Sequence, residues 1–172
     1  MKNKLRFLKK KRLLIPFSLA MLLVIANSCI SLRMSDKNVV RSFKKDNKIP
    51  KIYYTRYKGK PMRYIASKPL DSELPTLLFL HGAPGDASNF FSYLKDSMLN
   101  TKANLISIDR LGYGYSNYGK VEISIAEQAE SAFSILNENN AKDVIAIGWS
   151  YGGTIAAKLI FLHPEMVKHA IL

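Results

Sequence analysis

The sequence lacks several features that would otherwise decide its class. Its 172 residues contain one cysteine, Cys29, which excludes an internal disulfide and a thiolate metal site. It has only three histidines, and no apolar run reaches the roughly 20 residues that a membrane-spanning helix needs. Acidic side chains are absent from residues 1–28, and only two accompany twelve basic ones in 29–68.

The formal net charge of +13 therefore comes from the N-terminal part of the chain. Residues 69–172 hold seven basic and eleven acidic side chains, so they are mildly acidic. A nucleic-acid-binding protein needs a basic face interleaved with aromatic residues, and no such face accompanies the motifs described below. The charge distribution excludes nucleic acid as a partner.

The N-terminus has the pattern of an export signal. A basic segment precedes the apolar run 13–26, whose length of 14 residues suits a signal peptide. Small residues then lead to Cys29, and this junction resembles a relaxed bacterial lipobox, in which the cysteine is lipidated. We expect a lipoprotein-type signal peptide at 1–28 and a protein attached to the membrane of the bacterial cell envelope. The alternatives are an uncleaved signal anchor and a buried thiol.

The segment that follows, 29–51, is polar and rich in lysine. We interpret it as a basic tether that would lie close to an anionic membrane surface. Val39, Val40 and Phe43 are spaced as one face of a short helix, which is the alternative.

Beyond residue 51 the pattern is that of an α/β protein. Two alternating runs, 52–57 and 62–66, predict a β-hairpin. Strand-like and helix-like segments then alternate, with strands expected at 76–80, 104–108, 144–147 and 170–172 and helices at 89–99, 123–138 and 154–163. This rhythm predicts one α/β domain over 52–172, with a mostly parallel, doubly wound sheet and helices on both faces.

One stretch places a serine between a strand and a helix. Ser150 lies in Gly-x-Ser-x-Gly, between the apolar run 144–147 and the helical pattern 154–163. This is the layout of a nucleophile elbow, in which the serine occupies a strained turn. Gly148 and Gly152 fit such a turn because a side chain at either position would collide across it. The interpretation without catalysis is a glycine-rich turn that only allows close packing.

Two further motifs follow earlier strands. His81-Gly82-Ala83-Pro84-Gly85 comes directly after the strand 76–80, where a backbone N–H of an oxyanion hole would be found. Ala83 is the candidate for that donor, and the N–H of Tyr151 is the second. Asp109-Arg110-Leu111-Gly112-Tyr113-Gly114-Tyr115-Ser116 follows the strand 104–108. An ordinary turn is the alternative interpretation of the first motif.

Together the three motifs resemble those of the α/β-hydrolase superfamily, over roughly Ile52 to Leu172. The first of the two loops resembles the oxyanion loop of peptidase- and esterase-like members, and the second resembles their D-x-x-G-x-G-x-S loop. The resemblance implies that His81 braces its loop and that Asp109 orients backbone and Arg110. The motif residues to which it gives structural roles are His81, Gly82, Gly85, Asp109, Gly112, Gly114, Gly148 and Gly152.

A catalytic triad cannot be assembled from this sequence. In this fold the acid and the histidine follow the serine, yet only 22 residues follow Ser150. None of His81, His163 and His169 is placed to be the general base that a serine needs. We therefore expect the N-terminal part of a hydrolase domain, ending within the strand after the nucleophile helix.

Three function classes remain open. The first is a serine hydrolase acting on an ester, amide or related carbonyl of a small molecule or peptide, without a cofactor or metal. Its missing half would come from a separate chain or from a continuation of this one. The second is an inactive remnant, and the third is a membrane-tethered lipoprotein that binds without chemistry. A serine at the elbow argues against dehalogenase or epoxide-hydrolase chemistry, which by resemblance uses aspartate there.

Overall fold

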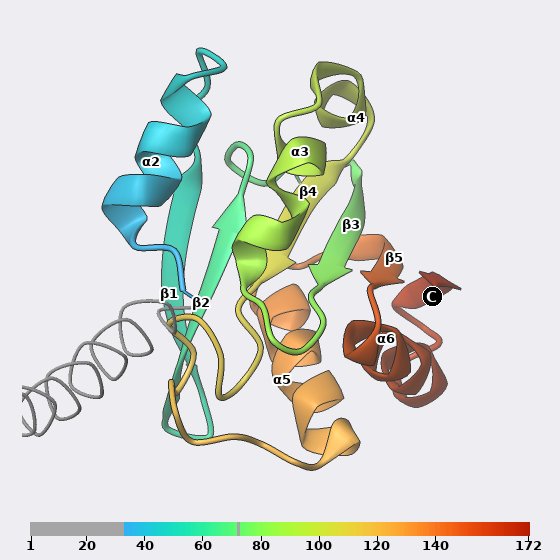
Figure 1. Cartoon of the computed structure of the whole chain (residues 1–172). Helices are drawn as coiled ribbons and strands as arrows, with labels where there is room; N and C mark the ends of the chain where they lie inside the picture. Colours follow the sequence, from blue (N-terminus) through green and yellow to red (C-terminus); the bar gives the residue numbers. More distant parts are fainter. Residues whose placement is uncertain (1–32, 72) are drawn as a thin grey trace, which may run out of the picture. The chain divides into compact units, whose positions relative to one another are not determined.

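A computed structural model of the protein describes residues 33–71 and 73–172. The predicted signal peptide and Cys29 lie outside the described residues. The strands are β1 (Lys51–Tyr57), β2 (Lys60–Ala66), β3 (Pro75–Leu80), β4 (Asn104–Ile108), β5 (Lys142–Gly148) and β6 (Val167–Ile171). They form one sheet in the order β1-β2-β4-β3-β5-β6 (Figure 1).

The sheet is antiparallel at one side and parallel elsewhere. β1 and β2 form the predicted hairpin, and β2 pairs antiparallel with β4. Lys58 and Gly59 turn the hairpin with φ of 47° and 76°, as a two-residue turn with positive φ at both positions requires. β4, β3, β5 and β6 are parallel neighbours. The predicted mostly parallel sheet with an N-terminal hairpin is confirmed.

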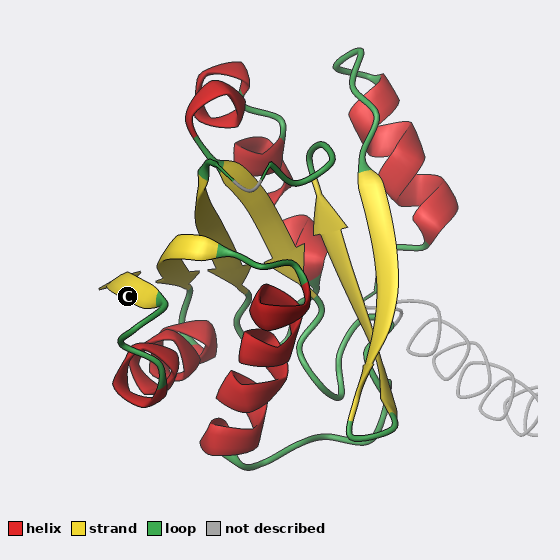
Figure 2. Ribbon diagram, turned by 180° about the vertical axis from the view of Figure 1, so that it is seen from behind, coloured by secondary structure: helices red, strands yellow, loops and turns green. Residues whose placement is uncertain are grey.

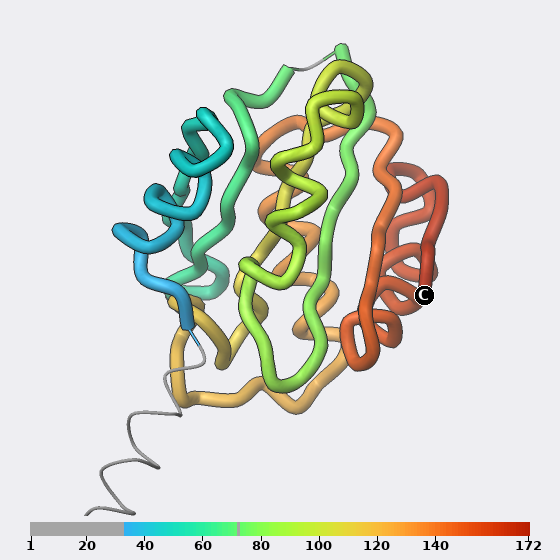
Figure 3. The backbone as a smooth tube through the Cα atoms, turned by 45° about the horizontal axis from the view of Figure 1, so that its top comes forward, coloured from blue at the N-terminus to red at the C-terminus, as the bar shows by residue number. Residues whose placement is uncertain are grey.

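Helices cover both faces of this sheet. They are α2 (Asp36–Lys44), the short 3-10 helix η1 (Ala87–Phe90), α3 (Phe91–Leu94), α4 (Ser97–Lys102), α5 (Ile125–Glu138) and α6 (Tyr151–Leu162). Seen from behind, α5 and α6 lie in front of the strands (Figure 2), whereas α2 and α3 lie on the opposite face (Figure 3). Each pair encloses its own apolar core against the sheet.

Helix α2 corrects the prediction of a tether over 29–51. Ser35 caps the helix by accepting a hydrogen bond from the N–H of Asn38. Val39 and Phe43 are fully buried, and the Phe43 ring meets Phe91 edge-on at 5.0 Å. The predicted tether is therefore wrong for this segment, because two apolar side chains suffice to fix an amphipathic helix once a sheet face receives them.

The predicted helix at 89–99 is also wrong in form. The chain makes η1, α3 and α4 instead of one continuous helix. Asp96 explains the break, because its backbone is extended and its carboxylate accepts a hydrogen bond from the N–H of Leu99. That arrangement is an N-cap, and it starts a new helix within the predicted one.

Candidate active site

The three motif loops meet at one edge of the sheet. They follow the carboxyl ends of β3, β4 and β5, which are parallel neighbours. From β3 the chain crosses to β4 on one side, and it then returns past β3 to β5. Ligands of open α/β sheets bind where the strand order reverses in this way. The fold therefore places the candidate site at the carboxyl end of β3.

Ser150 occupies a strained turn between β5 and α6. Its backbone has φ 54° and ψ −122°, a conformation that residues with a side chain rarely adopt, and the residue is exposed. A Cβ atom on Gly148 would lie 2.3 Å from the carbonyl oxygen of Gly152, and one on Gly152 would lie 2.0 Å from that of Leu80. Only glycine fits at either position, so the turn is as sharp as an elbow requires.

The loop after β3 lies against this turn. A Cβ atom on Gly82 would be 3.2 Å from the Cβ atom of Ser150. Next to Gly82, Ala83 lines a hollow of about 190 Å³ together with Tyr151, Tyr113 and residues 121–123. Among the described residues, the backbone N–H groups of Ala83 and Tyr151 donate no hydrogen bond. Two free donors thus border one hollow beside the serine.

His81 is a buried, neutral part of the loop. Its Nδ1–H donates to the carbonyl oxygen of Gly82 at 2.7 Å, and its Nε2 accepts from the N–H of Arg110 at 3.1 Å. Burial, and then the charge of Arg110, lower the pKa of His81 to about 4. At neutral pH the ring is therefore uncharged, and both of its nitrogens are engaged. Gly85 packs closely here, since its Cβ atom would lie 3.1 Å from His81 Nδ1.

Arg110 ties the loop after β3 to the loop after β4. Its Nε donates to the carbonyl oxygen of His81 at 2.6 Å, and its Nη2 to that of Gly82 at 2.9 Å. The guanidinium carbon lies 4.5 Å from the centre of the Tyr113 ring and 5.0 Å from that of Tyr151. Nη1 is buried and has no partner among the described residues. The side chain fixes the backbone from which the N–H of Ala83 projects.

Asp109 is paired with Arg63, not with Arg110 as predicted. Its carboxylate accepts from Arg63 Nε at 2.7 Å, from the N–H of Ala87 at 2.8 Å and from the N–H of Tyr115 at 2.7 Å. Burial raises the pKa of the carboxyl, and the Arg63 charge and the two N–H groups limit that rise. The reason for the correction is geometric, because the Arg110 side chain is already committed to backbone carbonyls.

The two glycines of this loop are required by close contacts. Gly114 has φ +52°, and a Cβ atom on it would lie 2.1 Å from the carboxyl carbon of Asp109. Gly112 has φ +91°, and its Cβ atom would lie 2.7 Å from the Cα atom of Val121. The loop therefore folds around the Asp109 carboxylate and holds the segment of Val121 beside the hollow.

No histidine of the described chain reaches Ser150. His163 is stacked on the Phe133 ring with centroids 3.5 Å apart, and His169 lies in β6. No side chain among residues 33–71 and 73–172 hydrogen-bonds to the Ser150 hydroxyl. The same residues contain no cluster of three or more His, Cys, Asp or Glu that could hold a metal ion. The structure thus brings together Ser150, Ala83 and Tyr151 without a base.

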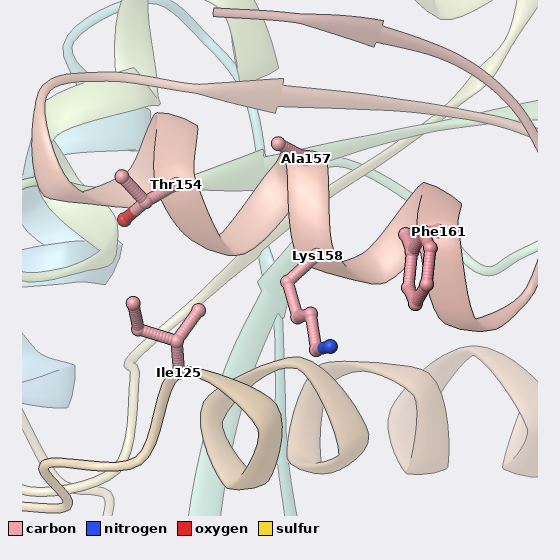
Figure 4. Close-up of a pocket in the computed structure, with 5 residues that line it drawn as sticks. All are labelled: Ile125, Thr154, Ala157, Lys158 and Phe161. Carbon is pink, nitrogen blue, oxygen red and sulfur yellow. The ribbon is translucent and has the colours of Figure 1, made fainter.

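A second, more open hollow of about 520 Å³ lies between α5 and α6. Figure 4 shows Thr154, Ala157, Lys158 and Phe161 projecting from α6, with Ile125 at the start of α5. Lys158 is the only ionisable group in its lining, and its amine lies 4.7 Å from the centre of the Phe161 ring. Its lining includes neither the serine nor the free N–H donors, so the smaller hollow is the better candidate site.

Sequence reasoning missed Arg63. This fully buried side chain joins Asp109 to Asp36 at 2.8 Å and to the carbonyl oxygen of Met34 at 2.9 Å. The signal was present, because an arginine inside the otherwise apolar run 62–66 is unusual for a buried strand. What the sequence did not reveal is which carboxylates would pair with it.

The comparisons with known proteins agree with this geometry. A family model described as the alpha/beta hydrolase fold matches residues 75–172. A 1-acylglycerol-3-phosphate O-acyltransferase of Arabidopsis thaliana is 33% identical over 129 residues, which are 71% of this chain and 30% of the relative. A proline iminopeptidase of Lactobacillus helveticus is 32% identical over 107 residues, or 59% and 36% of the two chains.

Other relatives and solved structures extend the list. A mouse (Mus musculus) sn-1-specific diacylglycerol lipase is 26% identical over 102 residues, 59% of this chain and 33% of its own. A membrane phospholipase A has a TM-score of 0.65 and 21% identity, covering 90% of this chain and 50% of that one. An epoxide hydrolase has a TM-score of 0.61 and 20% identity, covering 70% and 41%. Below 25% identity, these structures show the fold alone.

The chain spans about a third of the length of the curated relatives it matches. Within that span, the family model covers more than half of the chain and includes all three motif loops. The strand order, the strained serine and the packed glycines are those that the motifs predict. The chain belongs to the α/β-hydrolase fold family.

Proposed function

We propose that the protein is a serine hydrolase acting on an ester, amide or related carbonyl substrate. The observation that carries the proposal is Ser150, exposed on its left-handed turn and in contact with the loop of Gly82. Its hydroxyl would attack the carbonyl carbon, and the N–H groups of Ala83 and Tyr151 would hold the oxygen as it becomes negative. The acyl group would pass to Ser150, and water would then release it as the acid.

The names of the relatives support a carbonyl substrate. They include an O-acyltransferase, a diacylglycerol lipase and a proline iminopeptidase. Each name describes a reaction at an acyl carbon. The structural neighbours named as epoxide hydrolases do not oppose this, because their likeness concerns the fold alone. A hydroxyl nucleophile at the elbow suits acyl transfer.

The proposal requires a base that the described residues do not supply. We place the triad histidine and its acid in polypeptide outside these 172 residues, as a continuation or as a separate chain. Without that base the hydroxyl would stay protonated and the rate would fall by orders of magnitude. The unpartnered Ser150 hydroxyl is also what favours the second candidate, a protein that binds a ligand in the hollow without reacting.

A fluorophosphonate probe separates the two candidates. We expect the full chain in detergent to be labelled, and the label to be lost in Ser150→Ala. Ser92→Ala is the matched control, because Ser92 is also exposed but lies on α3 away from the motif loops. Absence of label from the wild-type protein would reject a working nucleophile in this chain and favour the binding protein or the inactive remnant.

We also propose that the protein is exported and attached to a membrane through Cys29. The support is the basic segment, the apolar run 13–26 and the small residues before the cysteine. Among residues 33–71 and 73–172, no helix has the length and apolarity needed to cross a bilayer. Incorporation of radiolabelled palmitate that disappears in Cys29→Ser would support lipidation. Membrane attachment that persists without such labelling would point to an uncleaved anchor.

A further inference from the structure

The segment that leads out of the fold toward the N-terminus is fixed at the edge of the sheet that carries the candidate site. The Arg33 guanidinium lies 4.3 Å from the centre of the Tyr118 ring and 4.9 Å from that of Tyr115. The next residue, Met34, donates its N–H to the carboxylate of Asp86, which caps η1 in the loop after β3. The chain therefore leaves the described fold between two of the motif loops.

Chain length then limits how far this edge can lie from a membrane anchor. Only four residues separate Cys29 from Arg33, and a fully extended chain spans at most about 3.6 Å per residue, or about 14 Å in all. A tether reaching residue 51 would have allowed a separation several times larger. With α2 packed onto the sheet, an anchor at Cys29 or just before it holds the site edge close to the lipid headgroups.

The same edge exposes apolar side chains around the smaller hollow. Ile123 is 85% exposed, Val121 61% and Trp149 58%. Val121 and Ile123 line the hollow with Ala83 and Tyr151, and the Trp149 ring lies beside Gly82 on its other side. Tyr118, beneath Arg33, is 47% exposed. We define Tyr118, Val121, Ile123 and Trp149 as the apolar rim. A cluster of this kind marks an interaction surface, whereas single exposed apolar residues do not.

The apolar rim is held in place. Gln128 on α5 donates through Nε2 to the carbonyl oxygens of Leu111 and Glu122, both at 3.0 Å. The loop that carries Val121 and Ile123 is thereby fixed at both ends, and it does not fold its apolar side chains inward. Its exposure is a built feature of the fold.

The charges at this edge are compatible with an anionic lipid surface. The carboxylates of Glu122 and Glu127 are paired with Lys60 at 2.9 Å and with Lys58 at 2.8 Å. Arg33 and Lys120 are exposed and form no ion pair among the described residues. Exposed aromatic and aliphatic side chains flanked by basic residues are what protein surfaces place at the headgroup level of a bilayer.

We propose that the apolar rim docks onto the lipid surface to which the N-terminus is attached, so that the hollow beside Ser150 opens onto the membrane. A substrate would then enter from the lipid layer, which favours an ester of an apolar acyl chain over a dissolved peptide. This inference rests on the membrane attachment proposed above, and the lipid-ester part rests on the proposed function.

Trp149 makes the proposal measurable, because it is the only tryptophan in the chain. The full chain is inserted through its own N-terminus into vesicles of phosphatidylethanolamine and phosphatidylglycerol that carry bromine on the acyl chains. We expect the bromine to quench Trp149 fluorescence, more strongly from positions near the glycerol backbone than from the bilayer centre. Val121→Ser/Ile123→Ser is expected to lose most of this quenching while the protein still floats with the vesicles.

The matched control is Ile49→Ser/Met98→Ser. Ile49 is 73% exposed and Met98 64%, but both precede strands at the opposite edge of the sheet. This variant should keep the quenching, and thermal melting should show that both double variants stay folded. If melting shows the rim variant destabilised, Ile123→Ser alone serves, since that side chain is the more exposed of the two.

Several results would overturn the proposal. They are an unquenched Trp149 in vesicle-bound protein, equal quenching in the rim variant, and failure of the full chain to float with vesicles. Ser150→Ala separates this proposal from the proposed function, because it removes the nucleophile and leaves the rim intact. Quenching that persists in Ser150→Ala, in a protein that the fluorophosphonate never labels, would support docking and reject catalysis.

Discussion

Two buried arginines hold two neighbouring regions of the protein in different ways. Arg63 lies at the centre of a region that joins α2, β2 and the loop after β4, and its partners include the carboxylates of Asp109 and Asp36. Arg110 lies in the region that joins the loop after β3 to the start of α6. It contacts two backbone carbonyls and two aromatic rings, and no carboxylate.

The difference separates stability from function. A buried charge that is neutralised by carboxylates contributes little field to its surroundings, and it locks the elements that supply those carboxylates. A buried charge that meets only carbonyl dipoles keeps a positive potential around it. In this protein that potential surrounds the backbone of Ala83 and Tyr151, where a negative oxygen would develop. The region of Arg63 is a clamp, and the region of Arg110 supports the proposed chemistry.

Removing the carboxylate of the clamp should have the largest effect. Asp109→Asn keeps the shape of the side chain but leaves Arg63 buried without its nearest counter-charge. We expect the free energy of unfolding to fall by about 3–5 kcal/mol, as when one partner of a buried pair is lost. Urea unfolding at neutral pH measures this. Glu127→Gln, which removes a partner of an exposed ion pair, is the control, and a loss no larger than in that control would contradict the assignment.

Acid should affect the region of Arg110 next. The pKa of His81 is lowered from 6.5 to about 4, so the unfolded chain binds a proton that the folded chain refuses. Stability from this histidine is complete above pH 6.5 and is lost as the pH falls toward 4. A shift of this size corresponds to at most about 3 kcal/mol.

The measurement is the difference in urea midpoint between pH 7 and pH 5. His81→Gln should flatten this difference relative to the wild type. His169→Gln, in an exposed strand position, should retain it. An unchanged pH dependence in His81→Gln would show that the ring is already charged in the folded state.

The smallest loss of global stability is expected for Arg110→Met, and it should be local. The two carbonyls of the loop after β3 would lose their donors, at a net cost of about 1–3 kcal/mol. Hydrogen exchange followed by mass spectrometry should show loop 81–86 exchanging about tenfold faster or more. The amides of α2 should be unaffected. Faster exchange in both regions would mean that the two arginines form one network and that the comparison fails.

The fold could be predicted because its signals are local. The five residues of β4 are apolar or small and are all buried, and the hairpin alternates as a two-stranded ribbon should. The glycines around Ser150 likewise revealed the turn, since steric necessity acts within five residues. Helix α2 was misjudged because its nine residues carry only two buried side chains, and the sheet face that receives them is distant in sequence.

The polar network could be predicted only in part. The sequence identified Asp109 as structural, but it suggested the adjacent Arg110 as the partner instead of Arg63, 46 positions earlier. Local order along the chain says nothing about which buried charge a loop will meet. The free N–H groups at Ala83 and Tyr151 were correctly located as candidates because motif spacing places them, although their role remains a proposal.

The Arg63–Asp109 pair also has a consequence in time. The hairpin that contains Arg63 is synthesised well before Asp109, and burying the guanidinium without its carboxylate is costly. The hairpin and α2 therefore stay undocked until β4 has formed and its loop has closed around the carboxylate. The last elements to settle onto the sheet are those made first, and the N-terminal end of the described chain is placed at its final position only when folding is nearly complete.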